Sequence, residues 1–165
     1  MVPTTPPTSL RPSRRSQGIS LQPPLGVRDV GCGKRVFDLP LKESLLAPAE
    51  ARRCARGVLQ SWGLDEEQVY DTLLVISELV TNAVTHAVPP VVLHLSVTAD
   101  DGHGQVRVCV SDGGKRKVPA AAWTEERPED EHGRGNLIIS ALVDECGAGL
   151  DAKGLIDHWA DLPAT

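Results

Sequence analysis

The chain has 165 residues, of which 41% are hydrophobic but only 3% aromatic, and its formal net charge at pH 7 is -5. This length is enough for one domain with a sizeable core, which must be built mainly from aliphatic side chains. The acidic balance argues against nucleic acid as the main partner. No apolar run approaches the roughly 20 residues of a membrane-spanning helix, so we expect no membrane span.

The cysteines are scattered along the chain, at Cys32, Cys54, Cys109 and Cys146, and form no CxxC pair. This pattern favours reduced thiols in a cytoplasm over a disulfide framework. No histidine lies near a cysteine at zinc-ligand spacing, so a structural metal site is not indicated. The N-terminus lacks the apolar segment of a secretory signal, and we expect a cytoplasmic protein.

Residues 1–34 are predicted to form a disordered tail, and residues 35–165 a single domain. The tail is rich in proline, serine and threonine, and its basic residues outnumber its acidic ones. Such a composition is typical of a solvated extension. An organelle transit peptide is the alternative, but the prolines oppose the amphipathic helix that such a peptide needs.

The periodicity of apolar residues predicts the remaining elements in chain order. They are a strand at 35–39 that ends at Pro40, a helix at 47–62 that ends at Gly63, a helix at 65–87, a hairpin of strands at 91–98 and 105–111, a loop at 115–131, a helix at 136–143, and a closing pair of strands at 145–150 and 155–162. Adjacent strand pairs indicate an antiparallel or mixed sheet. The predicted fold is therefore a two-layer α/β sandwich with the helices on one face.

The helix predicted at 65–87 has a start signal and two distinct side-chain lines. Asp65 is a candidate N-cap, with Gln68 at the capping-box position. An apolar stripe recurs at three- and four-residue steps, at Val69, Leu73, Ile76, Val80 and Val84. A second line, spaced four apart, holds Glu78, Asn82 and His86. An acid and an amide one turn apart on such a helix suggest either a solvated edge or a magnesium-nucleotide site.

Two glycine-containing motifs downstream help to decide between these alternatives. Asp112-Gly113-Gly114 directly follows a predicted strand, and Gly133-Arg134-Gly135 precedes a predicted helix. Each motif alone is weak evidence, because Asp-Gly-Gly is common in turns and GxG in any glycine-rich loop. Their order and their places in the predicted elements agree with a nucleotide site.

The three motifs together resemble those of the GHKL ATPases, the family of gyrase, histidine kinases and MutL. The matching segments are ELVTNAVTHA, VSDGG, HGRGNLIISALVDECG and a strand ending in His158-Trp159-Ala160, and the resemblance extends from about Arg35 to Leu162. Within the family, the chain is most similar to the bacterial anti-sigma-factor serine/threonine kinases. The resemblance implies the histidine-kinase-like ATPase fold and a site for ATP and Mg²⁺.

Roles for the helix residues follow from this resemblance. It implies that Glu78 is the catalytic residue, which accepts or orients the proton of an attacking hydroxyl. It implies that Asn82 holds Mg²⁺ through its carbonyl oxygen, an oxygen ligand of the kind that this ion prefers. His86 continues the same line of side chains. It either reaches a phosphate or the loop at 115–131, which would cover the nucleotide, or forms a hydrogen bond with the backbone at the helix end.

The downstream motifs are assigned to the base and the phosphates. The resemblance implies that Asp112 accepts a hydrogen bond from the adenine amino group, and that Gly114 lets the backbone approach the base. Gly133 and Gly135 would leave backbone N–H groups facing the phosphates at a helix start, and Arg134 contacts phosphate or is solvated. The loop at 115–131 would be the lid over the nucleotide.

The sequence departs from the family pattern at two places. Lys115 and Arg116 stand where a further glycine is expected, and Asn136 replaces an apolar residue after Gly135. Lys115, Arg116 and Lys117 put three positive charges at the start of the predicted lid, where they attract phosphates or face solvent.

The resemblance implies a serine/threonine protein kinase that is also an anti-sigma factor. Such a protein would bind a sigma factor, phosphorylate a small antagonist protein and thereby control transcription by partner switching. A homodimer is implied by the resemblance as well. The alternative is a non-catalytic module in which ATP only selects the protein partner. A third reading, a fragment of a larger ATPase machine, is disfavoured by the complete α/β order and by the absence of a transducer domain after residue 165.

Overall fold

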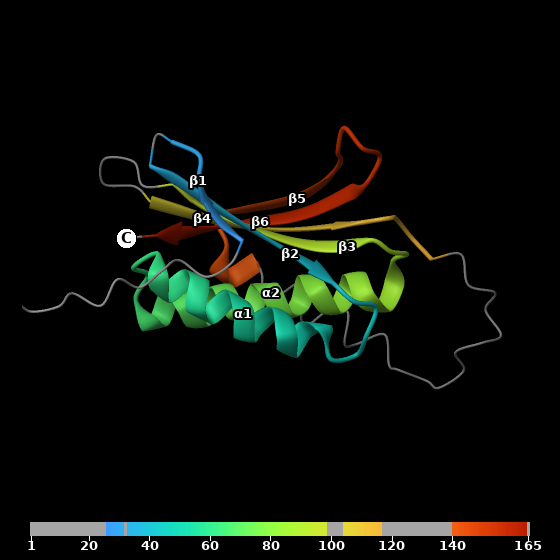
Figure 1. Cartoon of the computed structure of the whole chain (residues 1–165), viewed down its shortest axis with the longest axis horizontal. Coiled ribbons are helices and arrows are strands. Elements are labelled where there is room, and N and C mark those ends of the chain that lie inside the picture. Colours follow the sequence, from blue (N-terminus) through green and yellow to red (C-terminus); the bar gives the residue numbers. More distant parts are fainter. Residues whose placement is uncertain (1–25, 32, 99–103, 117–139, 165) are drawn as a thin grey trace, which may run out of the picture.

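The computed structural model describes residues 26–31, 33–98, 104–116 and 140–164 (Figure 1). Its elements in chain order are β1 (Val27–Asp29), β2 (Lys34–Leu41), α1 (Ala47–Ser61), α2 (Glu66–His86), β3 (Val91–Thr98), β4 (Gly104–Asp112), β5 (Glu145–Leu150) and β6 (Ile156–Ala164). The strands form one sheet in the order β1-β2-β3-β4-β6-β5. Every neighbouring pair in it is antiparallel.

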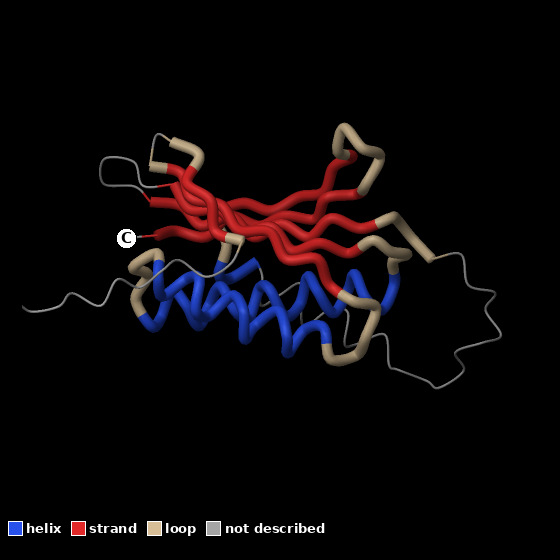
Figure 2. The backbone as a smooth tube through the Cα atoms, in the orientation of Figure 1, coloured by secondary structure: helices blue, strands red, loops and turns tan. Residues whose placement is uncertain are grey.

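Helices α1 and α2 lie side by side across one face of this sheet, and no described helix covers the other face (Figures 1 and 2). The predicted two-layer α/β sandwich is confirmed, with a sheet that is wholly antiparallel. Both predicted hairpins also form, β3 with β4 and β5 with β6. Strand β6 then inserts between β4 and β5, which places its side chains next to the end of β4.

Two expectations about the first strands were wrong. Residues within the predicted tail form β1, in which Val27 pairs with Phe37 of β2, whereas residues 1–25 lie outside the described part. Strand β2 also continues through Pro40 to Leu41 instead of ending there. Because β1 reaches only as far as Phe37, the end of β2 has a neighbour on one side only, and a proline without an N–H is tolerated there.

The start of α2 agrees with the sequence in detail. The Asp65 carboxylate accepts a hydrogen bond from the Gln68 N–H at 2.8 Å, and the Asp65 N–H donates to Gln68 Oε1 at 3.1 Å. This capping box satisfies two backbone donors that the helix itself leaves unpaired. The helix therefore begins at a defined residue, which fixes the register of everything that it carries.

Replacing Asp65 with alanine is expected to lower the free energy of unfolding by about 1 kcal/mol, because the first turn loses its acceptor. Urea denaturation monitored by circular dichroism measures this change. Asp65→Ser, which keeps a capping oxygen, is the matched control and should stay close to the wild type. Equal destabilisation by both substitutions would contradict the capping role.

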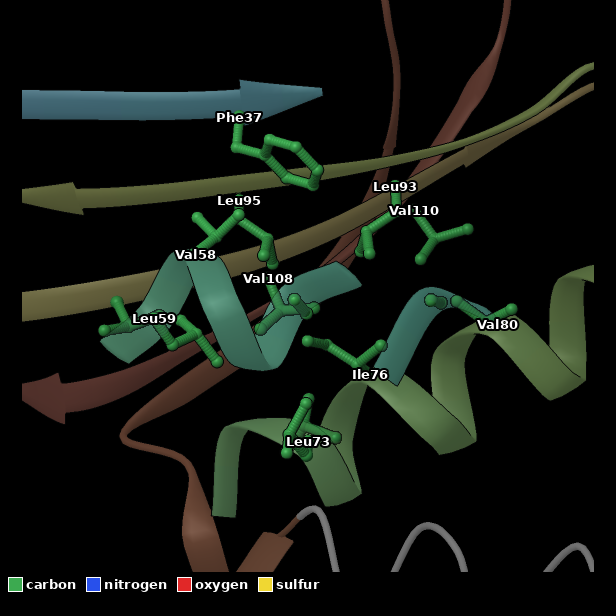
Figure 3. Packing of buried hydrophobic residues seen from close by; sticks show 14 of the residues in the cluster. Phe37, Val58, Leu59, Leu73, Ile76, Val80, Leu93, Leu95, Val108 and Val110 are labelled. Atoms are coloured by element: carbon green, nitrogen blue, oxygen red, sulfur yellow. The ribbon is translucent and has the colours of Figure 1, made fainter. Parts of the chain in front are cut away.

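The core lies between the helices and the sheet (Figure 3). Its largest fully buried aliphatic side chains come from α1, α2, β3 and β4; they include Val58, Leu59, Val69, Ile76, Val80, Leu93, Leu95, Val108 and Val110. The predicted apolar stripe of α2 is buried, except that Val84 is half-buried. Because this stripe packs on the sheet, the opposite side of α2 holds the second, polar line.

The uncovered face of the sheet carries an ion pair that links β4 to β6. The Arg107 guanidinium donates to both carboxylate oxygens of Asp161, at 2.6 and 2.5 Å, and lies 4.6 Å from the centroid of the Trp159 ring. The hydrogen bond that Arg107 donates to the Asp161 carboxylate raises the pKa of Arg107. Two parallel hydrogen bonds and the contact with the Trp159 ring restrict the Arg107 side chain to one orientation. The pair therefore helps to fix the register of β6 beside β4.

No helix in the described part of the chain combines the length and the hydropathy needed to cross a bilayer. The described cysteines Cys54, Cys109 and Cys146 are free, as the sequence predicts, and Cys32 lies outside the described residues.

Candidate nucleotide site

The C-terminal end of α2 is fastened to the loop that follows β4. The Val88 N–H donates to the Gly114 carbonyl at 2.9 Å, and the Gly113 N–H donates back to the Val88 carbonyl at 2.8 Å. A third backbone bond runs from the Arg116 N–H to the His86 carbonyl, also at 2.8 Å. These bonds hold the end of the polar line on α2 against the Asp112 turn, so two motifs that are distant in sequence belong to one site.

Both glycines of this turn are needed, for different reasons. A Cβ atom on Gly113 would lie 2.7 Å from the Pro89 carbonyl oxygen and 2.8 Å from that of Val88, closer than any real contact. Gly114 has a φ of 88°, in the left-handed region that L side chains rarely adopt. From the sequence, a role is expected for Gly114 alone. The paired glycines were the available signal for Gly113, but its neighbours become visible only in the fold.

Asp112, the last residue of β4, is the buried acid of the site, with 2% of its surface exposed. Its Oδ1 accepts a hydrogen bond from the Gly114 N–H at 2.7 Å. Its Oδ2 lies 3.5 Å from Nε2 of His158. A buried carboxylate requires donors, and here one oxygen is held by the turn while the other lies near the half-exposed His158 without a hydrogen bond from the described residues. Oδ2 can therefore accept a hydrogen bond from a ligand.

His158 is a neighbour of the site that belongs to the matching strand end His158-Trp159-Ala160 but for which the sequence predicted no role. In the register of β4 and β6 it lies opposite Val110, whose side chain is in the core beneath the helices. Side chains two apart on a strand share a face, so His158 and Asp112 lie on the helix-covered face of the sheet. The matching strand end does not reveal the contact with Asp112, because that contact depends on β6 inserting beside β4.

Arg116 joins three segments at the start of the predicted lid. Its Nε and Nη2 atoms donate to the Ala87 carbonyl at 3.3 and 3.1 Å, and Nη2 also forms an ion pair with Glu43 in the connection between β2 and α1. The sequence did not predict these partners, and attraction of phosphates by this partly exposed guanidinium stays a prediction. A cation here is favourable because the carbonyls at a helix C-terminus carry partial negative charge.

The remaining predicted residues of α2 lie on one side of an uninterrupted helix. Glu78 is half-buried, and Asn82 and His86 are exposed, one turn apart from each other. The line therefore runs toward the end of α2 that is fastened to the Asp112 turn. Gly133, Arg134 and Gly135 lie outside the described residues, as does the first half of the predicted helix at 136–143; in its second half, residues 140–142 are helical.

The polar side chains of the site fit a nucleotide with its magnesium ion better than a metal site in which all ligands come from the protein. Within the described ranges, no three His, Cys, Asp or Glu side chains gather closely enough to hold a metal ion. Mg²⁺ in nucleotide sites takes only one or two ligands from the protein, with phosphates and waters supplying the others. The exposed amide oxygen of Asn82 suits that position, and Oδ2 of Asp112 suits the amino group of a base.

Comparison with known proteins agrees with this geometry. Residues 42–155 match the model of the histidine kinase-like ATPase domain family. Among solved structures, the RsbU and RsbW domains of Rv1364c from Mycobacterium tuberculosis align with a TM-score of 0.57 and 23% identity, over 79% of this chain and 33% of that one. The SiaB-SiaC complex from Pseudomonas aeruginosa aligns with a TM-score of 0.42 and 14% identity, over 78% of this chain and 88% of that one. This chain thus spans about a third of the length of the Rv1364c chain. Since the family model covers more than half of the sequence, the chain belongs to the histidine kinase-like ATPase domain family.

Proposed function

We propose that this domain binds Mg-ATP between the end of α2 and the Asp112 turn and transfers the γ-phosphate to a serine or threonine of a partner protein. The observation that carries the proposal is the buried Asp112 carboxylate. One of its oxygens is held by the Gly114 N–H, and its loop is bonded to the helix that carries Glu78 and Asn82.

Adenine would be recognised through its exocyclic amino group. Oδ2 of Asp112 would accept a hydrogen bond from this group, and a charged acceptor makes that bond stronger than a neutral one. Gly114, with its positive φ, and Gly113, packed on Val88, let the backbone come close to the base without a side chain in the way.

The phosphates would lie along the polar line of α2. Asn82 would hold Mg²⁺, which offsets the charge of the triphosphate. Gly133, Arg134 and Gly135 are proposed to contact the phosphates, with His86 at the helix end reaching a phosphate or the lid. Glu78, one turn before Asn82, would be the catalytic residue.

In the transfer step, the hydroxyl oxygen of the acceptor attacks the γ-phosphorus and Glu78 takes the hydroxyl proton. The new O–P bond forms as the bond between the γ-phosphorus and the bridging oxygen of ADP breaks, so ADP leaves with that electron pair.

The partners follow from the motifs that resemble the anti-sigma-factor kinases. A small antagonist protein would supply the acceptor serine, and a sigma factor would be the second partner, so that phosphorylation switches one for the other and controls transcription. A homodimer is part of the same proposal. The exposed Arg52, Arg53 and Arg56 give α1 a basic surface that is available to an acidic partner.

The test is incubation of the protein with γ-labelled ATP and its cognate antagonist protein. We expect label on a serine or threonine of the antagonist, and labelling that is about 10²-fold slower or more when Glu78→Gln replaces the wild type. Binding of ATP without any transfer by the wild type would instead support the non-catalytic module, and transfer at the wild-type rate in Glu78→Gln would contradict the assigned role.

Replacing Asp112 with asparagine is expected to weaken Mg-ATP binding about 10- to 100-fold, since a hydrogen bond to a charged acceptor is lost. Isothermal titration calorimetry measures the dissociation constant. The matched control is Asp157→Asn on the neighbouring strand, where the carboxylate accepts a hydrogen bond from Ser111 instead. This control should bind ATP like the wild type, and equal losses in both variants would argue against base recognition by Asp112.

A further inference from the structure

The Asp112 carboxylate is held at one oxygen by the backbone, and its other oxygen lies near a side chain that has no assigned role. Oδ1 accepts from the Gly114 N–H at 2.7 Å, and Oδ2 lies 3.5 Å from Nε2 of His158. The side chain of His158 is 46% exposed, whereas that of Asp112 is 3% exposed. His158 thus stands at the rim of the site, between the buried carboxylate and solvent.

From this contact we propose that His158 is a positioning residue that fixes the Asp112 carboxylate and thereby sets a preference for adenine over guanine nucleotides. The inference rests on the proposed function, because it assigns the base specificity of the same site. It adds a residue from β6 to a base site otherwise built from β4 and the turn after it.

The preference for adenine over guanine depends on how many oxygens of the Asp112 carboxylate face the base. Adenine offers one amino group at this edge, which a single oxygen can accept. Guanine offers two adjacent N–H donors, on N1 and on the 2-amino group, which suit two oxygens presented side by side, and its O6 is repelled by a lone carboxylate oxygen. A carboxylate that presents only Oδ2 therefore selects adenine.

The Gly114 hydrogen bond alone does not hold this orientation. The terminal torsion of an aspartate is broad and roughly two-fold, so a carboxylate held at one oxygen can swing about that bond. A donor at Oδ2 restricts the swing and leaves one lone pair of that oxygen for the base. The 3.5 Å separation exceeds a hydrogen bond, and contacts of this kind tighten when the ligand is bound.

The register of the sheet makes His158 the residue that can act here. Ile156 lies directly opposite Asp112 and offers no donor, and Asp157 lies opposite Ser111 on the uncovered face, where it accepts the Ser111 hydroxyl. The next side chain of β6 on the covered face is that of His158. Its imidazole ring reaches back along the strand to the carboxylate.

The test measures the dissociation constants of Mg-ATP and Mg-GTP by calorimetry for the wild type and three variants. His158→Leu removes the donor at similar bulk, and His158→Gln keeps an amide N–H near the Nε2 position. His158→Asn keeps polarity, but its amide is too short to reach Oδ2. Thermal unfolding of each variant shows that the fold is retained.

We expect the wild type to prefer ATP, and His158→Leu and His158→Asn to reduce the ratio of GTP to ATP dissociation constants about 10-fold. His158→Gln should restore the wild-type ratio, which a purely structural role would not require. An unchanged ratio in the leucine and asparagine variants, or an equal loss of affinity for both nucleotides, would overturn the inference.

The outcomes separate this inference from the proposed function. Failure of the wild type to bind either nucleotide would overturn the proposed function and this inference with it. Binding of ATP that depends on Asp112 but has the same base preference in every His158 variant would overturn the role of His158 and leave the proposed function standing.

Discussion

Replacing Glu78 with glutamine is expected to slow phosphoryl transfer to the partner protein about 10²- to 10⁴-fold, because the acceptor hydroxyl loses the group that takes its proton. Glutamine has nearly the same shape and is compatible with a helix. The helix and the Asp112 turn should therefore remain intact, and Mg-ATP should still bind. Transfer of labelled phosphate gives the rate, and calorimetry gives the affinity.

A second carboxylate on α2 provides the control for this substitution. Glu67 is exposed in the first turn of the helix, far from the end that is fastened to the Asp112 turn. Glu67→Gln should transfer phosphate at the wild-type rate. A Glu78→Gln protein with wild-type transfer would show that another group takes the proton, and one that loses ATP affinity would assign Glu78 to binding.

Replacing Gly113 with alanine is expected to lower the free energy of unfolding by about 1–3 kcal/mol, the usual cost of overpacking. The added Cβ would lie 2.7 Å from the Pro89 carbonyl oxygen and 2.8 Å from that of Val88, and neither backbone atom can move like the end of a side chain. The turn must shift away from α2, which breaks its two hydrogen bonds with Val88. Urea denaturation measures the stability, and calorimetry should show weaker binding of Mg-ATP.

Gly57 provides the matched glycine. It lies inside α1 with no atom within 4 Å of where its Cβ would be. Gly57→Ala should raise stability by about 0.4–1 kcal/mol, since alanine favours the helix and restricts the unfolded chain. If Gly113→Ala were as stable as the wild type and bound ATP equally well, the close approach of the turn to α2 would not be required.

The features predicted correctly from the sequence are those that depend on neighbouring residues. The capping box at Asp65 and Gln68 and the buried stripe of α2 follow from spacing along one helix. The hairpin of β3 and β4 follows from two alternating segments separated by a short turn. The order of these elements was enough to predict the layers of the fold.

The features that the sequence did not reveal depend on contacts between distant segments. Strand β1 is short and lies among proline-rich residues, and it exists because Val27 and its neighbours pair with β2. Pro40 ends strands in general but is tolerated where β2 has a single neighbour. In the site, the close packing of Gly113 on Val88 and the approach of His158 to Asp112 require the sheet order and register, which no local pattern encodes.

Arg116 illustrates the same limit for electrostatics. Its place in a run of positive charges suggested attraction of phosphates, whereas its guanidinium bonds to the Ala87 carbonyl and to Glu43. A run of like charges in a sequence predicts whether the surface that it forms is positive or negative. Only the fold determines which of its members already have partners.

The most direct test of the nucleotide site is a calorimetric titration of Mg-ATP into the wild-type protein and the Asp112→Asn variant. If Asp112 recognises the base, Mg-ATP binds saturably at one site in the wild type and about 10- to 100-fold more weakly in the variant. Absence of binding at millimolar Mg-ATP, or equal affinities in the two proteins, would contradict it.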